Sequence, residues 1–184
     1  MADATLQTDL GRVLVTGGSG FVGANLVTEL LERGLEVRAF DRVASRLPEH
    51  PRLEVLEGDI TDTDDVAAAV DGIDTVFHTA AIIDLMGGGS PSGEARKRSF
   101  AVNVTGTENL VRAAQKAGVQ RFVYTASNSV VMGGQEISGG DETLPYTDRF
   151  ADLYTETKVV AEKFVLGQNG EQGMLTCSIP VSYT

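Results

Sequence analysis

The chain alternates short, continuously apolar runs with segments of helical periodicity, and this alternation constrains its fold more than any other feature. Strands are expected at residues 12–16, 36–41, 53–57, 74–78, 120–127 and 174–179. Helices are expected at residues 20–33, 61–70, 94–117 and 151–166. Strands that are apolar along their whole length are typical of sheets covered on both faces. The sequence therefore predicts an α/β fold, a Rossmann-like doubly wound parallel sheet of about six strands with helices on both faces.

The segments between these elements contain turn and loop residues and no domain boundary. Residues 61–64 fit a capping box that starts the second helix. The glycine-rich residues 87–93 and the polar residues 133–150 are expected to form loops. No repeat or linker divides the chain, and 184 residues are ample for one buried core. We therefore expect a single domain over residues 1–184.

The balance of charge excludes one large class of function. The chain has 15 Lys and Arg residues against 26 Asp and Glu residues, a net charge of −11. A general nucleic-acid binder needs a concentrated positive field, so nucleic acid is not an expected partner. The local basic cluster of Arg96, Lys97 and Arg98 is interpreted as a solvated helix face.

The single cysteine and the lack of long apolar stretches indicate a reducing compartment and no membrane span. Cys177 is the single cysteine, so it has no internal disulfide partner, and its apolar surroundings predict a small core residue in a reducing compartment. The first ten residues contain two Asp and no apolar signal region. No apolar stretch approaches the ~18 residues that a membrane span needs. These features predict a cytoplasmic protein without a transmembrane segment.

A glycine-rich turn follows the first predicted strand and leads into the first predicted helix. Gly17 permits a tight turn, Gly20 lets the backbone approach a pyrophosphate, and Gly23 lets the helix and strand pack closely. The free N–H groups of the helix N-terminus then face the phosphate charge. A chain with 21 glycines also produces such spacing by chance. The strand before the turn, the helix after it and an acid beyond favour a dinucleotide site.

That acid is Asp41, which ends the second predicted strand 18 residues after Gly23. A carboxylate here accepts hydrogen bonds from the adenine ribose hydroxyls of NAD and repels the extra phosphate of NADP. Arg42 could pair with that phosphate or lie against adenine, yet Asp41 favours NAD as the cofactor. Asp59 and Ile60 follow the third strand as candidate adenine contacts, although Asp59 also suits a loop acid that starts the next helix.

A candidate catalytic group is formed by Ser127, Tyr154 and Lys158. The phenol and the ammonium are four residues apart on a predicted helix and so share one face, although a plain surface pair has the same spacing. Ser127 ends the fifth strand, and ligands of open α/β sheets bind at such carboxyl ends. A phenol is a poor base at pH 7, but a neighbouring positive charge lowers its pKa. Tyr154 could then take a proton from a substrate alcohol while hydride leaves the same carbon for nicotinamide. Ser127 would hold the substrate oxygen, and Lys158 would also reach the nicotinamide ribose.

These motifs together resemble the extended short-chain dehydrogenase/reductases. The resemblance rests on residues 16–23, 58–60, 78–81, 103–107, 124–130 and 154–158, and it covers nearly the whole chain. The detail at residues 78–81, 122–127 and 176–179 is most similar to the 3β-hydroxysteroid dehydrogenase branch, especially its bacterial sterol dehydrogenases. The resemblance implies NAD-dependent oxidation of a 3β-hydroxysteroid to the 3-ketosteroid, with a linked shift of the ring double bond from Δ5 to Δ4.

The resemblance also implies roles for individual residues. It makes Ser127, Tyr154 and Lys158 catalytic, and it makes Asn103 the residue that ties the site together. The implied cofactor contacts are Gly17, Gly20, Phe21, Val22, Gly23, Asp41, Arg42, Asp59, Ile60, Ala80, Ala81, Asn103, Tyr154, Lys158 and Pro180. His78 ends a strand beside the cofactor, and we interpret it as a packed, hydrogen-bonded residue rather than a base. The chain has two histidines and no cluster with ligand spacing, so no metal site is expected.

The end of the chain departs from the family pattern. Ile179 stands where the family usually has arginine before the proline that matches Pro180, and the family continues into a substrate-binding region. We therefore expect a truncated chain in which a sterol finds no apolar enclosure, and activity of this length of chain is in question. The last strand would also be poorly covered and open to edge pairing. A homodimer is compatible with the sequence.

Two other functions remain open on the sequence. A nucleotide-sugar epimerase or dehydratase shares the glycine turn and the Tyr154–Lys158 pair. The apolar residues 81–86 after the fourth strand favour an apolar substrate instead, although ordinary loop packing also explains them. A non-catalytic NAD-binding module is the third possibility, opposed by the intact catalytic group and favoured by the missing substrate region.

Overall fold

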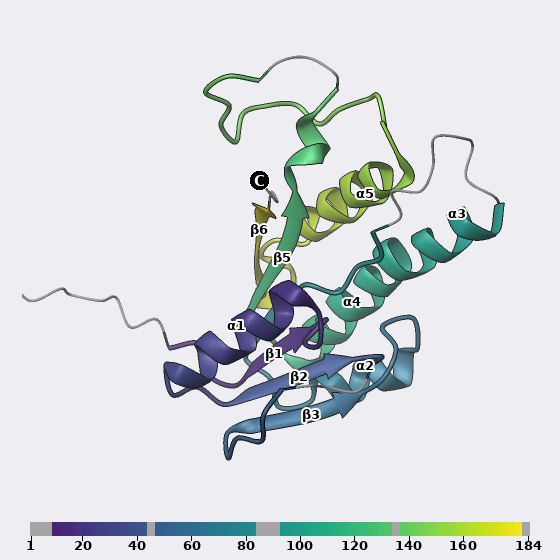
Figure 1. The fold of residues 1–184 in the computed structure, drawn as a ribbon. Coiled ribbons are helices and arrows are strands. Elements are labelled where there is room, and N and C mark those ends of the chain that lie inside the picture. The colour runs from purple at the N-terminus through teal and green to yellow at the C-terminus, as the bar shows by residue number, and fades with distance from the viewer. Residues whose placement is uncertain (1–8, 44–46, 84–92, 134–136, 182–184) are drawn as a thin grey trace, which may run out of the picture.

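The computed structural model describes residues 9–43, 47–83, 93–133 and 137–181. In these residues, six parallel strands form one sheet in the order β3-β2-β1-β4-β5-β6 (Figure 1). The strands are β1 (Val13–Thr16), β2 (Val37–Asp41), β3 (Leu53–Glu57), β4 (Thr75–His78), β5 (Arg121–Ser127) and β6 (Leu175–Val181). This order confirms the predicted doubly wound sheet, because the chain moves outward from β1 first in one direction and then in the other.

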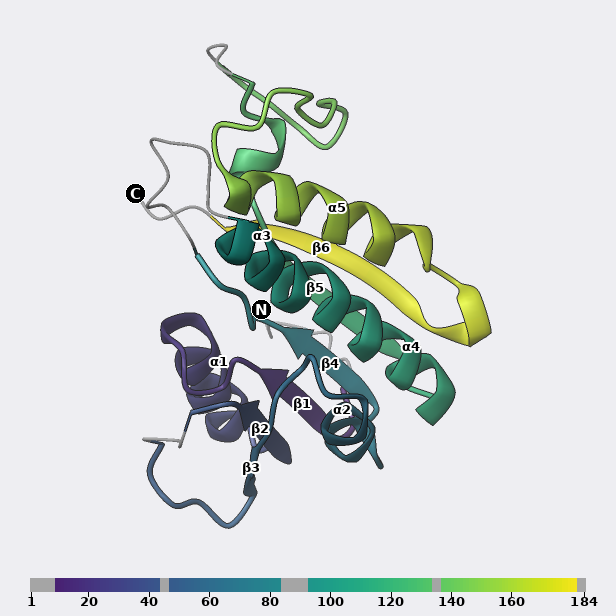
Figure 2. The same cartoon turned by 90° about the vertical axis from the view of Figure 1, so that its right-hand side faces the viewer.

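Helices connect the strands and cover both faces of the sheet. They are α1 (Phe21–Glu32), α2 (Thr63–Val70), α3 (Gly93–Phe100), α4 (Thr107–Ala117) and α5 (Leu153–Gly167). Short helical segments are η1 (Ala101–Gly106), η2 (Asn128–Val131) and η3 (Glu171–Gly173). Figure 2 shows α1 on one side of the sheet and α2, α4 and α5 on the other. Among the described residues, no helix has both the length and the hydropathy needed to cross a bilayer.

Each face of the sheet contributes to its own apolar core. Along β1, Leu14 points into the larger core, whereas Val13 and Val15 point into the smaller one, and all three are fully buried. The larger core packs the sheet against α2, α4 and α5, and the smaller core packs it against α1. This two-sided burial is the reason why the central strands are apolar at every position.

The edge strand β6, unlike the central strands, is not buried on both faces. Leu175 and Ile179 are 61% and 51% exposed, and Cys177 between them is exposed as well. The side chains of these alternate residues lie on the face opposite α5, where no described segment covers them. The prediction that Cys177 is a buried core residue is therefore wrong. Pro180, which has no backbone N–H, is compatible with an edge strand.

The long helix predicted at residues 94–117 is present as a continuous run of α3, η1 and α4, but its middle is π-helical. The Thr107 hydroxyl donates to the Asn103 carbonyl at 2.7 Å inside this segment. Arg96, Lys97 and Arg98 are all exposed on α3, as predicted for a solvated face.

The start of α2 also differs in detail from the predicted capping box. Asp62 is the N-cap, and its carboxylate accepts from the N–H groups of Asp64 and Asp65 at 2.8 and 3.2 Å. Thr61 lies one residue before this N-cap, and its hydroxyl and its N–H both donate to the Asp59 carboxylate at 2.8 Å.

Candidate cofactor and active site

The turn between β1 and α1 leads into the helix through glycines, and two of them, Gly17 and Gly23, have no room for a side chain. Gly17 has a positive φ of 70°, and a Cβ atom there would lie 2.7 Å from the Ala80 nitrogen. A Cβ atom on Gly23 would collide with the Gly17 carbonyl oxygen. The N-cap residue Gly20 has no side chain to cap α1, so the first N–H groups of the helix are open to a ligand. An anionic group such as a pyrophosphate suits this cradle.

A cavity of about 320 Å³ opens beside this turn. It collects residues from the carboxyl ends of several strands, as expected for a doubly wound sheet. The predicted cofactor residues that line it are Gly17, Gly20, Phe21, Val22, Gly23, Asp41, Arg42, Asp59, Ile60, Ala80 and Ala81. The cavity is also lined by residues that were not predicted as cofactor contacts, namely Phe40, Gly58, Thr79, Ile82, Ile83 and Val102. Gly58 and Thr79 lie inside the recognised motifs, and Ile82 and Ile83 belong to the apolar residues 81–86. Nothing in the sequence distinguishes Phe40 and Val102 from ordinary packing residues.

Asp41 is held at the rim of this cavity by the backbone. Its carboxylate accepts from the Ser19 N–H at 2.9 Å and from the Val43 N–H at 3.2 Å. Each carboxylate oxygen keeps a further lone pair for ribose hydroxyls. The neighbouring Arg42 is exposed and also lines the cavity.

His78 at the end of β4 is buried and joins two elements of the site. Its Nδ1 lies 2.6 Å from the Thr16 hydroxyl, and its Nε2 lies 2.9 Å from the Thr107 hydroxyl. Because Thr107 donates its hydrogen to the Asn103 carbonyl, Nε2 must be the protonated nitrogen and Nδ1 accepts from Thr16. Burial, together with the positive charge of Lys158, lowers the His78 pKa to about 3. The prediction of a packed, hydrogen-bonded residue is confirmed, and the lowered pKa adds that the ring is neutral.

Asn103 links the cavity to α5. Its Oδ1 accepts from the Ile82 N–H at 2.8 Å, and its Nδ2 donates to the Ile82 carbonyl at 2.9 Å and to the Thr157 hydroxyl at 3.0 Å. Three residues later, Gly106 lets the helix approach Ile60, since a Cβ there would lie 2.7 Å from the Ile60 side chain. The π-helical turn therefore sits where two parts of the site meet, a frequent position for such turns.

Lys158 is buried beneath the start of α5. Its Nζ donates to the Thr125 carbonyl at 2.6 Å and lies 4.5 Å from the ring centre of Tyr124 and 5.9 Å from that of Tyr154. Burial lowers the Lys158 pKa to about 8, and the charge of Glu162 opposes this change. At pH 7 the ammonium form therefore still predominates.

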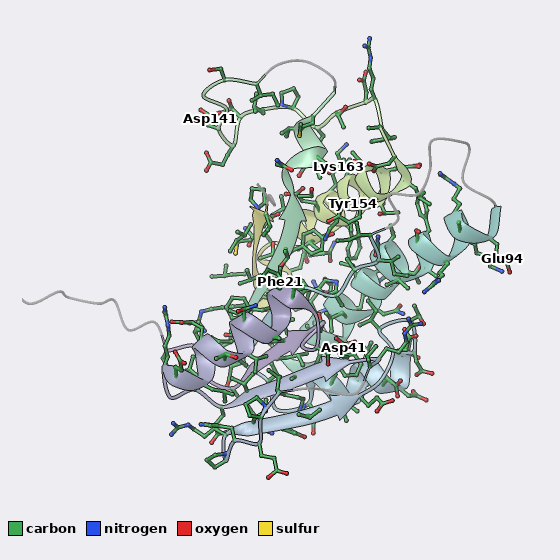
Figure 3. The ribbon with its side chains drawn as sticks, in the orientation of Figure 1. Phe21, Asp41, Glu94, Asp141, Tyr154 and Lys163 are labelled. Carbon is green, nitrogen blue, oxygen red and sulfur yellow. The ribbon has the colours of Figure 1, made fainter. Side chains whose placement is uncertain are left out.

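Ser127 ends β5, the strand on which α5 packs. Its Oγ accepts from the Ser129 hydroxyl at 2.9 Å and from the Ser129 N–H at 3.2 Å. Because the Ser127 Oγ accepts both of these hydrogen bonds, its own hydrogen can be donated to another oxygen, such as that of a substrate. Figure 3 labels Tyr154 in the first turn of α5, Phe21 at the start of α1 and Asp41 at the end of β2.

The remaining predicted residues fall into two groups. Asn103, Ser127, Tyr154 and Lys158 do not line the glycine-rich cavity, but Asn103 reaches it through its bonds to Ile82. Pro180 pairs with Ala126 on the edge strand β6 and does not line that cavity either. In the described part of the chain, no group of three or more His, Cys, Asp or Glu residues could hold a metal ion.

Comparison with known sequences identifies closely similar proteins. The sequence model of the 3-beta hydroxysteroid dehydrogenase/isomerase family matches residues 14–183. A 3-beta-hydroxysteroid dehydrogenase of Mycolicibacterium neoaurum is 79% identical over 97% of this chain and 49% of its own length. A 3 beta-hydroxysteroid dehydrogenase/Delta 5→4-isomerase of Mycobacterium tuberculosis is 77% identical over 97% of this chain and 48% of its own length. The chain thus spans about half the length of the curated relatives it matches.

Solved structures show the same fold. A short-chain dehydrogenase/reductase superfamily protein from Agrobacterium tumefaciens, crystallised with bound NAD, has a TM-score of 0.80 and 32% identity, over 94% of this chain and 49% of that one. A UDP-glucose 4-epimerase from Thermus thermophilus in complex with NAD has a TM-score of 0.77 and 30% identity, over 92% of this chain and 54% of that one.

Proposed function

Because the chain belongs to the 3-beta hydroxysteroid dehydrogenase/isomerase family, we propose that residues 1–184 form the NAD-binding domain of an NAD-dependent 3β-hydroxysteroid dehydrogenase. The observation that carries this proposal is the charged, buried Lys158, whose Nζ lies 5.9 Å from the centre of the Tyr154 ring, on a helix that Asn103 links to the glycine-lined cavity. The relatives named for this activity are about twice as long, so the reaction itself is proposed for the whole protein.

The cavity suits a dinucleotide in three respects. The uncapped N-terminus of α1 offers N–H groups to a pyrophosphate, and the glycines leave room for it. Asp41 suits the adenine ribose hydroxyls and disfavours a 2′-phosphate. When bound, NAD supplies the hydride acceptor. The test is a fluorescence titration of this chain with NADH and NADPH, and saturable binding that prefers NADH supports the proposal. Absence of NADH binding by the folded chain would refute it.

The proton chemistry is assigned to three side chains. Tyr154 accepts the proton of the substrate hydroxyl, and the nearby Lys158 ammonium favours the phenolate that can do so. Ser127 donates its hydrogen to the substrate oxygen, since its own acceptor sites are filled by Ser129. In an active full-length form, Tyr154→Phe is expected to abolish turnover while NADH binding persists. Unchanged turnover would remove Tyr154 from the mechanism.

The steroid class of the substrate is supported by the names of the relatives and by apolar residues near the site. Ile82, Ile83 and Val102 line the cavity on the side that Asn103 ties to α5. The linked shift of the double bond from Δ5 to Δ4 is proposed on the same grounds. The measurement is turnover of a 3β-hydroxysteroid by the full-length form, with NADH formation and enone absorbance followed separately.

A nucleotide-sugar epimerase remains the second candidate, because structures with NAD and that activity share the fold. Binding of a nucleotide sugar without steroid turnover would favour it, and NADH binding with neither activity would favour the non-catalytic module. A homodimer and a cytoplasmic location also stay predictions. Sedimentation of the purified chain tests the first, and fractionation of cells tests the second.

A further inference from the structure

Glu162 is a buried carboxylate that the proposed reaction does not use. It lies on α5, one helical turn beyond Lys158, and is only 7% exposed. Its Oε1 accepts from the Ser178 hydroxyl of β6 at 2.6 Å. Its Oε2 is buried and has no hydrogen-bond partner among the described residues. A buried, half-satisfied carboxylate is costly, so its presence calls for a compensating interaction.

The positive charge that acts on Glu162 is the Lys158 ammonium. Residues four apart on a helix lie on one face, separated by roughly 6 Å of rise. The two charges attract each other through the buried interior: Glu162 raises the Lys158 pKa, and Lys158 lowers the Glu162 pKa. Burial is the stronger influence on each group and acts in the opposite direction.

The other described titratable groups around Lys158 do not supply the negative charge that would compensate its ammonium. His78 of β4 is neutral, and burial raises the pKa of the Tyr124 phenol on β5 far above its usual value. Tyr146, in the segment before α5, also has its pKa raised, first by burial and then by Glu162. Tyr154 presents its ring to the Lys158 ammonium. Within the described ranges, Glu162 is therefore the carboxylate that acts on Lys158.

We propose that Glu162 is a positioning residue, a buried counter-anion that keeps Lys158 charged, and that Ser178 of β6 holds its carboxylate in place. Even with Glu162 opposing it, burial lowers the Lys158 pKa to about 8. Without Glu162 the ammonium would be lost in the neutral range, and with it the charge that favours a phenolate at Tyr154. The importance of this pair for catalysis rests on the proposed function, whereas the electrostatic coupling is independent of it.

The test is an NMR titration of Lys158 in the cofactor-free chain. Lysine labelled at Cε gives signals for Lys158 and for the exposed lysines, and Lys158→Arg identifies the signal that disappears. Unit charges roughly 6 Å apart in a medium of effective dielectric about 20 change each other's pKa by about two. Glu162→Gln is therefore expected to lower the Lys158 pKa by about two.

Glu156→Gln is the matched control. Glu156 is a carboxylate on the same helix, two residues before Lys158, but it is engaged by Arg96 at 2.6 and 2.7 Å at the surface. Its removal is expected to change the Lys158 pKa by less than about 0.3, because solvent screens exposed charges. A comparable fall in both variants would overturn the proposal.

The direction of the change separates this role from a purely structural one. If Glu162 only fills space, Glu162→Gln loosens the interior and the Lys158 pKa rises toward the ordinary value of about 10.4. A rise, or no change, contradicts the proposal. Should Glu162→Gln not fold, two readouts remain. The wild-type Lys158 signal must show a second, acidic inflection as Glu162 titrates, and Ser178→Ala must move that inflection to higher pH. A single inflection refutes the coupling, and loss of NADH binding would refute only the proposed function.

Discussion

Arg38 on β2 is expected to contribute far more to stability than its exposed neighbour Arg12, although both pair with the same carboxylate oxygen. The Arg38 side chain is 8% exposed and its Nε donates to Glu54 at 2.8 Å. Its terminal nitrogen also donates to the carbonyls of Ala68, Ala69 and Asp71 at 3.1, 2.8 and 2.9 Å. These carbonyls end α2, so one buried guanidinium caps the helix and fastens it to the sheet.

The loss of stability expected on removing the Arg38 guanidinium depends on which of these hydrogen bonds water can replace. A hydrogen bond to a charged group contributes about 1.5–3 kcal/mol. The carbonyls of Ala68 and Asp71 belong to exposed residues and can be rehydrated, whereas the bond to Ala69 is buried. Arg38→Met keeps the apolar stem, and Glu54 keeps Arg12 as its partner. The expected loss is therefore about 3 kcal/mol, a large share of a total near 5–15 kcal/mol.

Arg12→Met is the matched comparison. Arg12 donates to the same Glu54 oxygen at 2.6 Å, a shorter distance, but its side chain is 37% exposed. Exposed ion pairs contribute less than about 1 kcal/mol, and salt weakens them further. The assay is urea unfolding at pH 7 followed by circular dichroism, at low and high salt. If Arg12→Met costs as much as Arg38→Met, burial is not the deciding quantity and the reasoning is refuted.

Three further outcomes are expected. Met174→Ala is expected to lower the free energy of unfolding by about 2–5 kcal/mol, because Met174 is fully buried. Leu175→Ala should lower it by less than about 0.5 kcal/mol, because Leu175 is 61% exposed. Equal losses in urea unfolding would contradict this. Folding lowers the Lys158 pKa to about 8, so between pH 8 and about 10.4 the unfolded chain binds more protons than the folded chain. The free energy of unfolding should therefore rise with pH over this range. Lys158→Met should lose this rise, and parallel stability–pH curves would argue against a buried ammonium. Asp41→Ala is expected to weaken NADH binding about tenfold and to raise the relative affinity for NADPH, and an unchanged preference in fluorescence titrations would exclude Asp41 as the selector.

Much of the fold and the candidate site follows from short-range patterns. The order of strands and helices is encoded in hydrophobic periodicity, which depends only on neighbours in the chain. The turn at Gly17, Gly20 and Gly23 was predictable because the positive φ of Gly17 and the close approach of Gly23 to the Gly17 carbonyl arise within a few residues. Tyr154 and Lys158 share a face through helix geometry alone, and the strand ends of a parallel sheet bring Asp41 and Asp59 to one cavity.

Other features required the tertiary structure because they join residues far apart in the sequence. The bond between Glu162 and Ser178 exists only because β6 packs beside α5, and the tautomer of His78 depends on Thr16 and Thr107 from two different elements. The same apolar run that predicted a buried Cys177 lies on an edge strand, on a face that no described segment covers. Local sequence thus determined which elements form and which chemical groups they carry. Packing alone decided which of those groups are buried, charged and paired, because burial and Coulomb interactions depend on distances in space rather than along the chain.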